Sequence, residues 1–302
     1  MTTHPPSTAP ADAMLAAVSQ TRESRGARLR RRLLQRGSTR VALGLLIVMV
    51  LAALLAPWFA THDPFSGSND ALLPPLSPGH WLGTDDLGRD IWSRVVHGTR
   101  VSLLVGIASS ALAVTLGVTV GAVAGYFGGW IDVVLMRIAE FFQTLPRFVL
   151  ALIVIALFGA STTKLIVVIG LLAWPQMARV VRATVASLQQ APFVDAARVA
   201  GMPDRTIIAK EILPNVAAPI IVLGSLDIAS AILIEASLSF FGLGDPNAIS
   251  WGGMLNDAQQ FLRSAWWMSA FPGLAIAMTV LAFNLLGDAL NDALNPRGER
   301  RP

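Results

Sequence analysis

Long apolar runs separated by short polar stretches are the main feature of this chain. The runs cover residues 41–60 and about 101–125, 133–158, 164–182, 216–240 and 268–288. About 20 helical residues are enough to cross a hydrocarbon core of ~30 Å. The pattern therefore predicts an all-α integral membrane protein with six transmembrane helices.

The polar stretches predict how these helices are organised. We expect an Arg-rich cytoplasmic arm over residues 1–40, disordered over 1–21, and then a first transmembrane helix over 41–60. A periplasmic segment, 61–99, leads to a five-helix core over 100–295. That core contains a polar cytoplasmic stretch at 183–215, and residues 296–302 form a cytoplasmic tail.

Charge and aromatic residues predict the orientation. Residues 22–40 hold eight Arg against one acid, Glu23, and basic segments beside apolar runs stay in the cytoplasm. Both termini are therefore expected to be cytoplasmic. Five tryptophans near the predicted outer boundaries are typical of an aromatic belt: Trp58, Trp81, Trp251, Trp266 and Trp267.

Composition supports the membrane assignment and narrows the chemistry. Hydrophobic residues make up 54% of the 302 positions and charged residues 14%, whereas soluble domains carry about 25% charged residues. The absence of Cys excludes disulfides and thiolate metal sites, and the four His show no metal-ligand spacing, so no metal site is expected. The net charge of +4 comes from Arg beside apolar runs, so we expect membrane lipid as a partner and no nucleic acid.

Motifs for nucleotide binding and nucleophilic catalysis are missing. Neither Lys164 nor Lys210 follows a Gly, which excludes a Gly-x-x-x-x-Gly-Lys phosphate loop, and no Gly-x-Ser-x-Gly motif is present. The chain is therefore not expected to be an enzyme or to bind a cofactor. Any ATP and Mg²⁺ would be held by partner subunits.

Several residues inside the apolar runs predict packing or polar contacts. Gly117, Gly121 and Gly125 repeat every fourth position, which lets a second helix approach closely. Arg137 and Glu140 are three apart and are expected to form a local ion pair.

Three charged residues are candidates for a translocation path, because a charge inside a span usually faces protein or water. Arg147 is placed to meet a carboxylate on the solute, or alternatively to pair with Glu140 or with a partner chain, and Pro146 would loosen the helix beside it. Asp227 and Glu235 are eight apart on one helix face. They either line the path or pair between subunits.

The stretch 183–215 predicts a short helix with small residues, stopped near Gly201, followed by a helix that enters the membrane. It contains Asp195, Ala196, Ala197 and Arg198, with Pro214 after Gly201. It resembles the Glu-Ala-Ala-x-x-x-Gly loop of permease subunits of binding-protein-dependent ABC importers, with Asp195 where Glu is usual. The resemblance implies that these six residues form the coupling helix region, which docks on the ATPase.

Other segments narrow this resemblance to the dipeptide, oligopeptide and nickel permeases of the "C" type. Residues 82–94 resemble the Gly-Thr-Asp-x-x-Gly-Arg-Asp motif of that group, on the periplasmic side, at Gly83, Asp85, Gly88, Arg89 and Asp90. A capped, salt-bridged helix entry would explain these five residues, with Asp85 or Asp86 as the cap and Arg89 paired with an acid. Direct contact with a binding protein or with the solute is the alternative. Residues 281–296 resemble the group's C-terminal ending, whereas the loop 239–255 matches in part and lacks the usual Pro pair.

The resemblance implies a type I ABC importer permease in the bacterial plasma (inner) membrane. It would form half of the path of an ATP-driven importer for di- or oligopeptides. Its implied partners are a second homologous permease, one or two ATP-binding subunits and a periplasmic or lipid-anchored binding protein. Nickel chelates, glutathione or opines are alternative solutes on the same scaffold. A self-sufficient secondary transporter is the alternative from another class, but no inverted repeat is visible.

Overall fold

A computed structural model describes residues 37–294 of the chain. The predicted disordered arm, most of the Arg-rich block and the predicted tail lie outside these residues. The described part is helical apart from its connecting segments and two isolated β-bridges, Ser77–His80 and Thr84–Asp90.

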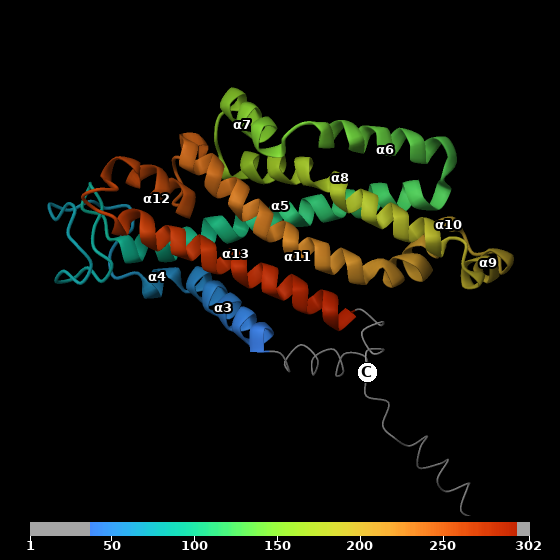
Figure 1. Cartoon of the computed structure of the whole chain (residues 1–302), viewed down its shortest axis with the longest axis horizontal. Helices are drawn as coiled ribbons and strands as arrows, with labels where there is room; N and C mark the ends of the chain where they lie inside the picture. Colours follow the sequence, from blue (N-terminus) through green and yellow to red (C-terminus); the bar gives the residue numbers. More distant parts are fainter. Residues whose placement is uncertain (1–36, 295–302) are drawn as a thin grey trace, which may run out of the picture.

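Figure 1 shows long helices lying side by side along one axis. The bounds, in chain order, are α3 Gly37–Leu54, α4 Ala56–Phe59, α5 Ile91–Phe127, α6 Gly129–Thr144, α7 Arg147–Phe158, α8 Thr162–Leu188, α9 Pro192–Val199, α10 Asp204–Thr206, α11 Leu213–Leu238, α12 Trp251–Ala258 and α13 Trp267–Leu294. Single π-helical segments, Ile207–Ile212 and Ser239–Leu243, flank α11, and a 3₁₀ turn, Gln259–Phe261, follows α12.

Five helical segments among the described residues are long and apolar enough to cross a membrane, and a sixth crossing is possible if α6 and α7 count as one span. The run expected to be one helix over 133–158 is instead bent by 82° between α6 and α7. The break lies at Leu145 and Pro146. Pro146 has no N–H for the helical hydrogen bond, and Leu145 before it is extended.

The close helix packing predicted from the glycine ladder is confirmed. Gly117, Gly121 and Gly125 on α5 all face α8, and these two helices make the most extensive contact in the fold. A β-carbon on Gly117 would lie 2.5 Å from the Met177 β-carbon, and one on Gly125 would lie 2.6 Å from the Arg182 carbonyl oxygen. Only glycine therefore allows this approach.

The segment 61–90 lies at one end of the bundle and α9 at the other (Figure 1). The first end is packed around Trp251, which is fully buried and donates its indole N–H to the Val95 carbonyl at 3.0 Å. Trp267 is also buried and donates to the Thr84 carbonyl. The prediction that these two tryptophans belong to an aromatic belt is wrong, because each indole N–H finds its partner inside the protein.

Candidate functional site

Two glycines shape the segment 61–90 so that it folds back on itself. Gly83 and Gly88 have positive φ angles of 81° and 71°, which favour glycine. A β-carbon on Gly88 would meet the Ser68 hydroxyl oxygen at 2.7 Å, and one on Gly83 would meet the Leu73 carbonyl. The motif residues are therefore held in a compact loop.

Asp85 is the centre of a buried ion-pair network in this loop. It is fully buried and accepts from the Leu87 N–H and the Arg89 N–H, both at 2.9 Å, and from the Arg89 Nε at 2.7 Å. Arg94 forms a second ion pair with Asp85. Asp257 on α12 then binds Arg89 at 3.2 Å and Arg94 at 3.0 Å, which ties the loop to α12.

The helix cap at this end differs from the prediction. Asp90, not Asp85 or Asp86, caps α5, and its Oδ2 accepts from the Ser93 N–H at 2.8 Å. Asp85 is already occupied by arginines, as expected for Arg89 paired with an acid. Burial raises the pKa of Asp90, but hydrogen bonds from His80, Ser93 and other neighbours outweigh it and hold that pKa below its ordinary value.

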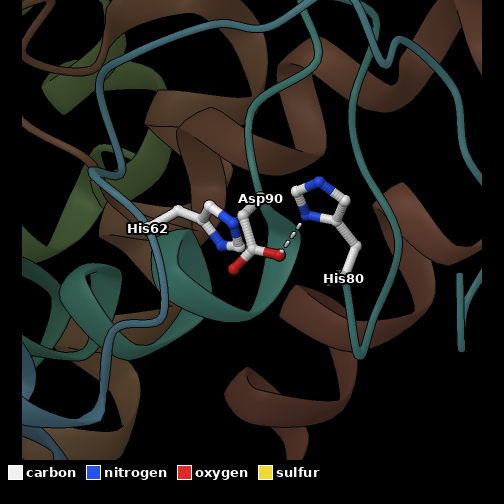
Figure 2. A group of neighbouring side chains, drawn as sticks. All are labelled: His62, His80 and Asp90. Carbon is white, nitrogen blue, oxygen red and sulfur yellow. Dashed lines mark hydrogen bonds and ion pairs between the residues drawn. The ribbon is translucent and has the colours of Figure 1, made fainter. Parts of the chain in front are cut away.

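Two histidines lie beside this cap. The His80 Nδ1 is 2.9 Å from the Asp90 Oδ1, and the His62 ring stacks on the His80 ring with centroids 4.6 Å apart (Figure 2). Spacing along the chain predicts no metal ligands among the histidines, yet one possible ligand atom from each of these three residues lies within 4.8 Å of the others. These residues meet only when the loop folds, so their spacing along the sequence does not predict the cluster.

The opposite end carries the stretch that resembles a coupling loop. Asp195, Ala196, Ala197 and Arg198 lie on α9, and Arg198 pairs with Asp195 at 3.3 Å. The helix stops as predicted. The chain then turns at Gly201, whose φ is 75°, and the Met202 N–H donates to the Ala197 carbonyl. Pro214 occupies the first turn of α11, after the π-helical segment.

One face of α9 is packed and the other is open. The buried residues Val194 and Ala197 join an apolar cluster with residues from α5, α8 and α11. Val199 is 90% exposed and Phe193 40% exposed.

Tyr126, near the end of α5, links the bundle to this stretch. Its hydroxyl donates to the Asp204 Oδ1 at 2.6 Å, and the Arg198 guanidinium lies 5.4 Å from the centre of its ring. Tyr126 is buried, with only 3% of its surface exposed. Sequence reasoning missed this residue, although it is the only Tyr in the chain and follows the last glycine of the ladder.

The candidate path residues are divided between two places. Arg147, the first residue of α7, donates to the Gln176 Oε1 at 3.0 Å. Gln176 and Asp227 both line a cavity of 70 Å³ in the middle of the bundle, together with Ser230. The structure therefore brings Arg147 and Asp227 to one region through Gln176, which the sequence analysis did not single out.

Glu235 lies elsewhere, fully enclosed near the 61–90 end. The Ser239 hydroxyl donates to it at 2.7 Å and the Ser102 hydroxyl at 3.3 Å. The Ser102 hydroxyl oxygen also accepts from the backbone N–H of Trp251 at 3.4 Å. The predicted ion pair between Arg137 and Glu140 is present at 3.2 Å and is well exposed on α6, so Glu140 has a partner other than Arg147.

Comparison with known proteins identifies two regions. The family described as binding-protein-dependent transport system inner membrane component matches residues 117–300. The N-terminal TM domain of oligopeptide transport permease C matches residues 24–75. The two matched regions thus lie on either side of the 82–94 motif.

Curated relatives cover most of the chain. A putative peptide transport system permease protein of Brucella suis is 40% identical over 88% of this chain and 90% of its own length. The glutathione transport system permease protein of Pectobacterium atrosepticum is 41% identical over 85% of this chain and 86% of its own length. The dipeptide transport system permease protein of Alkalihalophilus pseudofirmus is 41% identical over 84% of each chain.

A solved structure supports the fold. A chain of the MetNI methionine ABC transporter in inward-facing conformations superposes with a TM-score of 0.54 at 19% identity. The match covers 67% of this chain and 96% of that chain. At this identity the likeness concerns the helical arrangement alone.

Proposed function

The chain belongs to the family of binding-protein-dependent transport system inner membrane components, and on this basis we propose that it forms half of the translocation path of a peptide importer. It is a multi-pass inner-membrane permease of an ABC importer, whose ATPase activity lies in separate subunits. Membership confirms the resemblance found in the sequence and leaves no place for a self-sufficient secondary transporter.

Di- or oligopeptides are the proposed solutes. The observation that carries this proposal is that the relatives at 40–41% identity are named for peptide, dipeptide or glutathione transport. Glutathione is itself a small peptide, so it is the second candidate. Nickel chelates and opines have no comparable support among these relatives.

The proposed topology has six spans with both termini in the cytoplasm. The bent pair α6–α7 counts as one span in this arrangement. Segment 61–90 then faces the periplasm, and α9 faces the cytoplasm at the opposite end of the bundle (Figure 1). The basic residues Arg179, Arg182 and Arg198 lie toward the α9 end, as positive-inside topology requires.

Coupling to the ATPase is proposed to run through α9. Its open face, with Val199 and Phe193, suits a cleft on a soluble partner, and its packed face transmits displacement to the bundle. The other proposed partners are a second, homologous permease that completes a heterodimer, and a binding protein that delivers solute at the outer end. Mg²⁺ and ATP would be held by the ATPase pair.

The cavity between α5, α8 and α11 is the proposed part of the path in this subunit. A peptide carries a terminal carboxylate and a terminal ammonium group. Arg147 can pair with the carboxylate once Gln176 releases it, and Asp227 can pair with the ammonium. Glu235 is enclosed in this conformation, where the Ser239 and Ser102 hydroxyls hold it, so its proposed place at the outer end of the path requires a conformation in which that end opens.

The first test of the proposed function is a pull-down of the tagged chain from its native membrane in mild detergent. We expect a second permease, ATP-binding subunits and a binding protein, and the ligand of that binding protein would identify the solute class. Recovery of the chain alone, under conditions that keep other complexes intact, would contradict the proposal.

The second test concerns the path and compares matched arginines. In the assembled importer, Arg147→Ala should reduce dipeptide uptake at least ten-fold, and Arg147→Lys should restore part of it. Arg137→Ala removes an exposed ion pair on the preceding helix and should leave uptake within two-fold. Unchanged uptake by an assembled Arg147→Ala importer would refute the path assignment.

A further inference from the structure

We propose that His62, His80 and Asp90 form a binding site for a divalent transition-metal ion, with Zn²⁺ as the test ion. The cluster lies at the 61–90 end of the bundle, away from the cavity with Asp227 and from α9 (Figure 1). The proposal goes beyond the transport function and does not depend on which solute is carried.

The geometry brings the three donors to one place. The His80 Nδ1 is 2.9 Å from the Asp90 Oδ1, and the rings of His62 and His80 are inclined by 27° with centroids 4.6 Å apart. All three possible ligand atoms lie within 4.8 Å of one another. Figure 2 shows the three side chains together, with the bond between the Asp90 carboxylate and the His80 ring drawn as a dashed line.

The two carboxylate oxygens of Asp90 have different tasks. Oδ2 accepts from the Ser93 N–H at 2.8 Å, the Ser93 hydroxyl at 2.7 Å and the Thr61 hydroxyl at 3.1 Å. These bonds cap α5 and fix the orientation of the carboxylate. The bond found to Oδ1 in the described chain comes from His80, so Oδ1 faces the imidazoles with a lone pair to offer.

The backbone around the donors is held before any ion arrives. The N–H groups of Thr61 and His62 both donate to the Ser93 hydroxyl oxygen at 3.1 Å, and the His80 N–H donates to the Ser77 carbonyl. His80 and Asp90 are buried, whereas His62 is exposed. The side chain that must turn to complete the site is therefore the exposed one, and turning it gives up the 3.1 Å bond between the His62 Nδ1 and the Thr61 hydroxyl.

The donor set selects the class of ion. Two imidazoles and one carboxylate are typical ligands of Zn²⁺ and its neighbours, whereas Ca²⁺ and Mg²⁺ prefer oxygen-only sites. With bonds of about 2.0–2.1 Å, donors around one ion lie roughly 3.0–3.4 Å apart. The His80–Asp90 separation of 2.9 Å lies just below this range, and rotation of the His62 side chain supplies the third donor.

Binding would replace the proton that now joins His80 to Asp90. A carboxylate can only accept, so the Nδ1 carries that proton in the free protein. The ion would take its place at Nδ1, and the neutral ring would then carry its proton on Nε2. The bound ion would then join the turn after α4 to the first turn of α5.

The test is a zinc titration of the full chain, purified in nanodiscs with a tag that lacks histidine. Competition with a chromophoric zinc chelator gives stoichiometry and Kd. We expect one Zn²⁺ per chain with a Kd below about 1 µM, and unchanged affinity in excess Ca²⁺ or Mg²⁺. His62→Gln should weaken binding at least ten-fold.

His97→Gln is the matched control, because His97 lies on α5 about two turns beyond the Asp90 cap and bonds to the Ser93 carbonyl, outside the cluster. It should bind zinc as the wild type does. His62 is exposed, so His62→Gln should show the same zinc-free thermal unfolding as the wild type. Absent saturable binding, or equal zinc affinity in wild type and His62→Gln, would overturn the proposal and leave His80 as a structural partner of the helix cap.

Discussion

The substitution Gly125→Ala tests whether the α5–α8 contact depends on glycine. The added β-carbon would lie 2.6 Å from the Arg182 carbonyl oxygen and 2.9 Å from the Val185 β-carbon, whereas ordinary contact begins at 3.4 Å. Both obstacles belong to the backbone or are fixed directly to it. Rotation of a side chain cannot relieve them, so the two helices must separate.

The magnitude follows from that separation. A shortfall of about 0.8 Å is enough to forfeit a quarter to a half of the dispersion energy of the contacts that open. Overpacking of this kind costs about 1–3 kcal/mol, and the better helix propensity of Ala returns about 0.5–1 kcal/mol. The net range is about 0–2.5 kcal/mol, and because both obstacles lie under 3.0 Å we expect Gly125→Ala to fall in its upper half, above about 1 kcal/mol. Gly125→Leu should prevent accumulation of the protein in the membrane.

The assay measures thermal unfolding of the purified chain in detergent. Its elution as a monodisperse species is the readout. Gly44→Ala is the control, because a β-carbon at this α3 position meets nothing within 4 Å. It should be neutral or slightly stabilising. If Gly125→Ala unfolded at the same temperature as Gly44→Ala, close approach of α5 and α8 would not be what the glycine provides.

Three further substitutions test the two ends of the bundle. Tyr126→Phe removes the hydroxyl that donates to Asp204; it should cost about 1–2 kcal/mol and lower solute transported per ATP hydrolysed in the reconstituted importer. Asp257→Asn, at a half-buried ion pair, should cost about 1 kcal/mol in thermal unfolding, and no change would show that the arginines are satisfied within their own loop. Burial raises the pKa of the Asp245 carboxyl, but hydrogen bonds from Thr162 and Asn247 have the larger effect and hold that pKa below its ordinary value of 3.8. The stability that Asp245 contributes is thus present above the unfolded pKa and lost as pH falls through the folded one, and Asp245→Asn should flatten the melting temperature between pH 5 and about pH 3.

Local patterns predicted the features that depend on neighbouring residues. The apolar runs locate the long helices, and the four-residue glycine spacing predicts the α5–α8 contact, because both signals repeat along one helix. Gly201 predicts the end of α9 because glycine favours the positive φ angle that stops a helix. Pro146 was expected to loosen a helix, but it breaks the run by 82°, since the residue before it is also forced out of the helical region.

Features that depend on distant residues could not be read from the sequence. The partner of Arg94 on α12 lies 163 positions away, and the His62–His80–Asp90 cluster forms only when the loop folds back on the first turn of α5. The burial of Trp251 has the same origin. Its position near an apolar boundary fits a lipid interface equally well, and only the packing of α12 decides.

The two ends of the bundle are joined most directly by α5. Its first turn is capped by Asp90 and bound through Arg94 to α12, and its last turn is bound through Tyr126 to the segment after α9. At 37 residues it is about 55 Å long, and the glycine ladder holds it rigidly against α8. A displacement of α9 would therefore reach the 61–90 end as movement of one stiff element. Tyr126→Phe should therefore reduce the coupling of transport to ATP hydrolysis more than it reduces stability. Gly125→Ala should weaken both together.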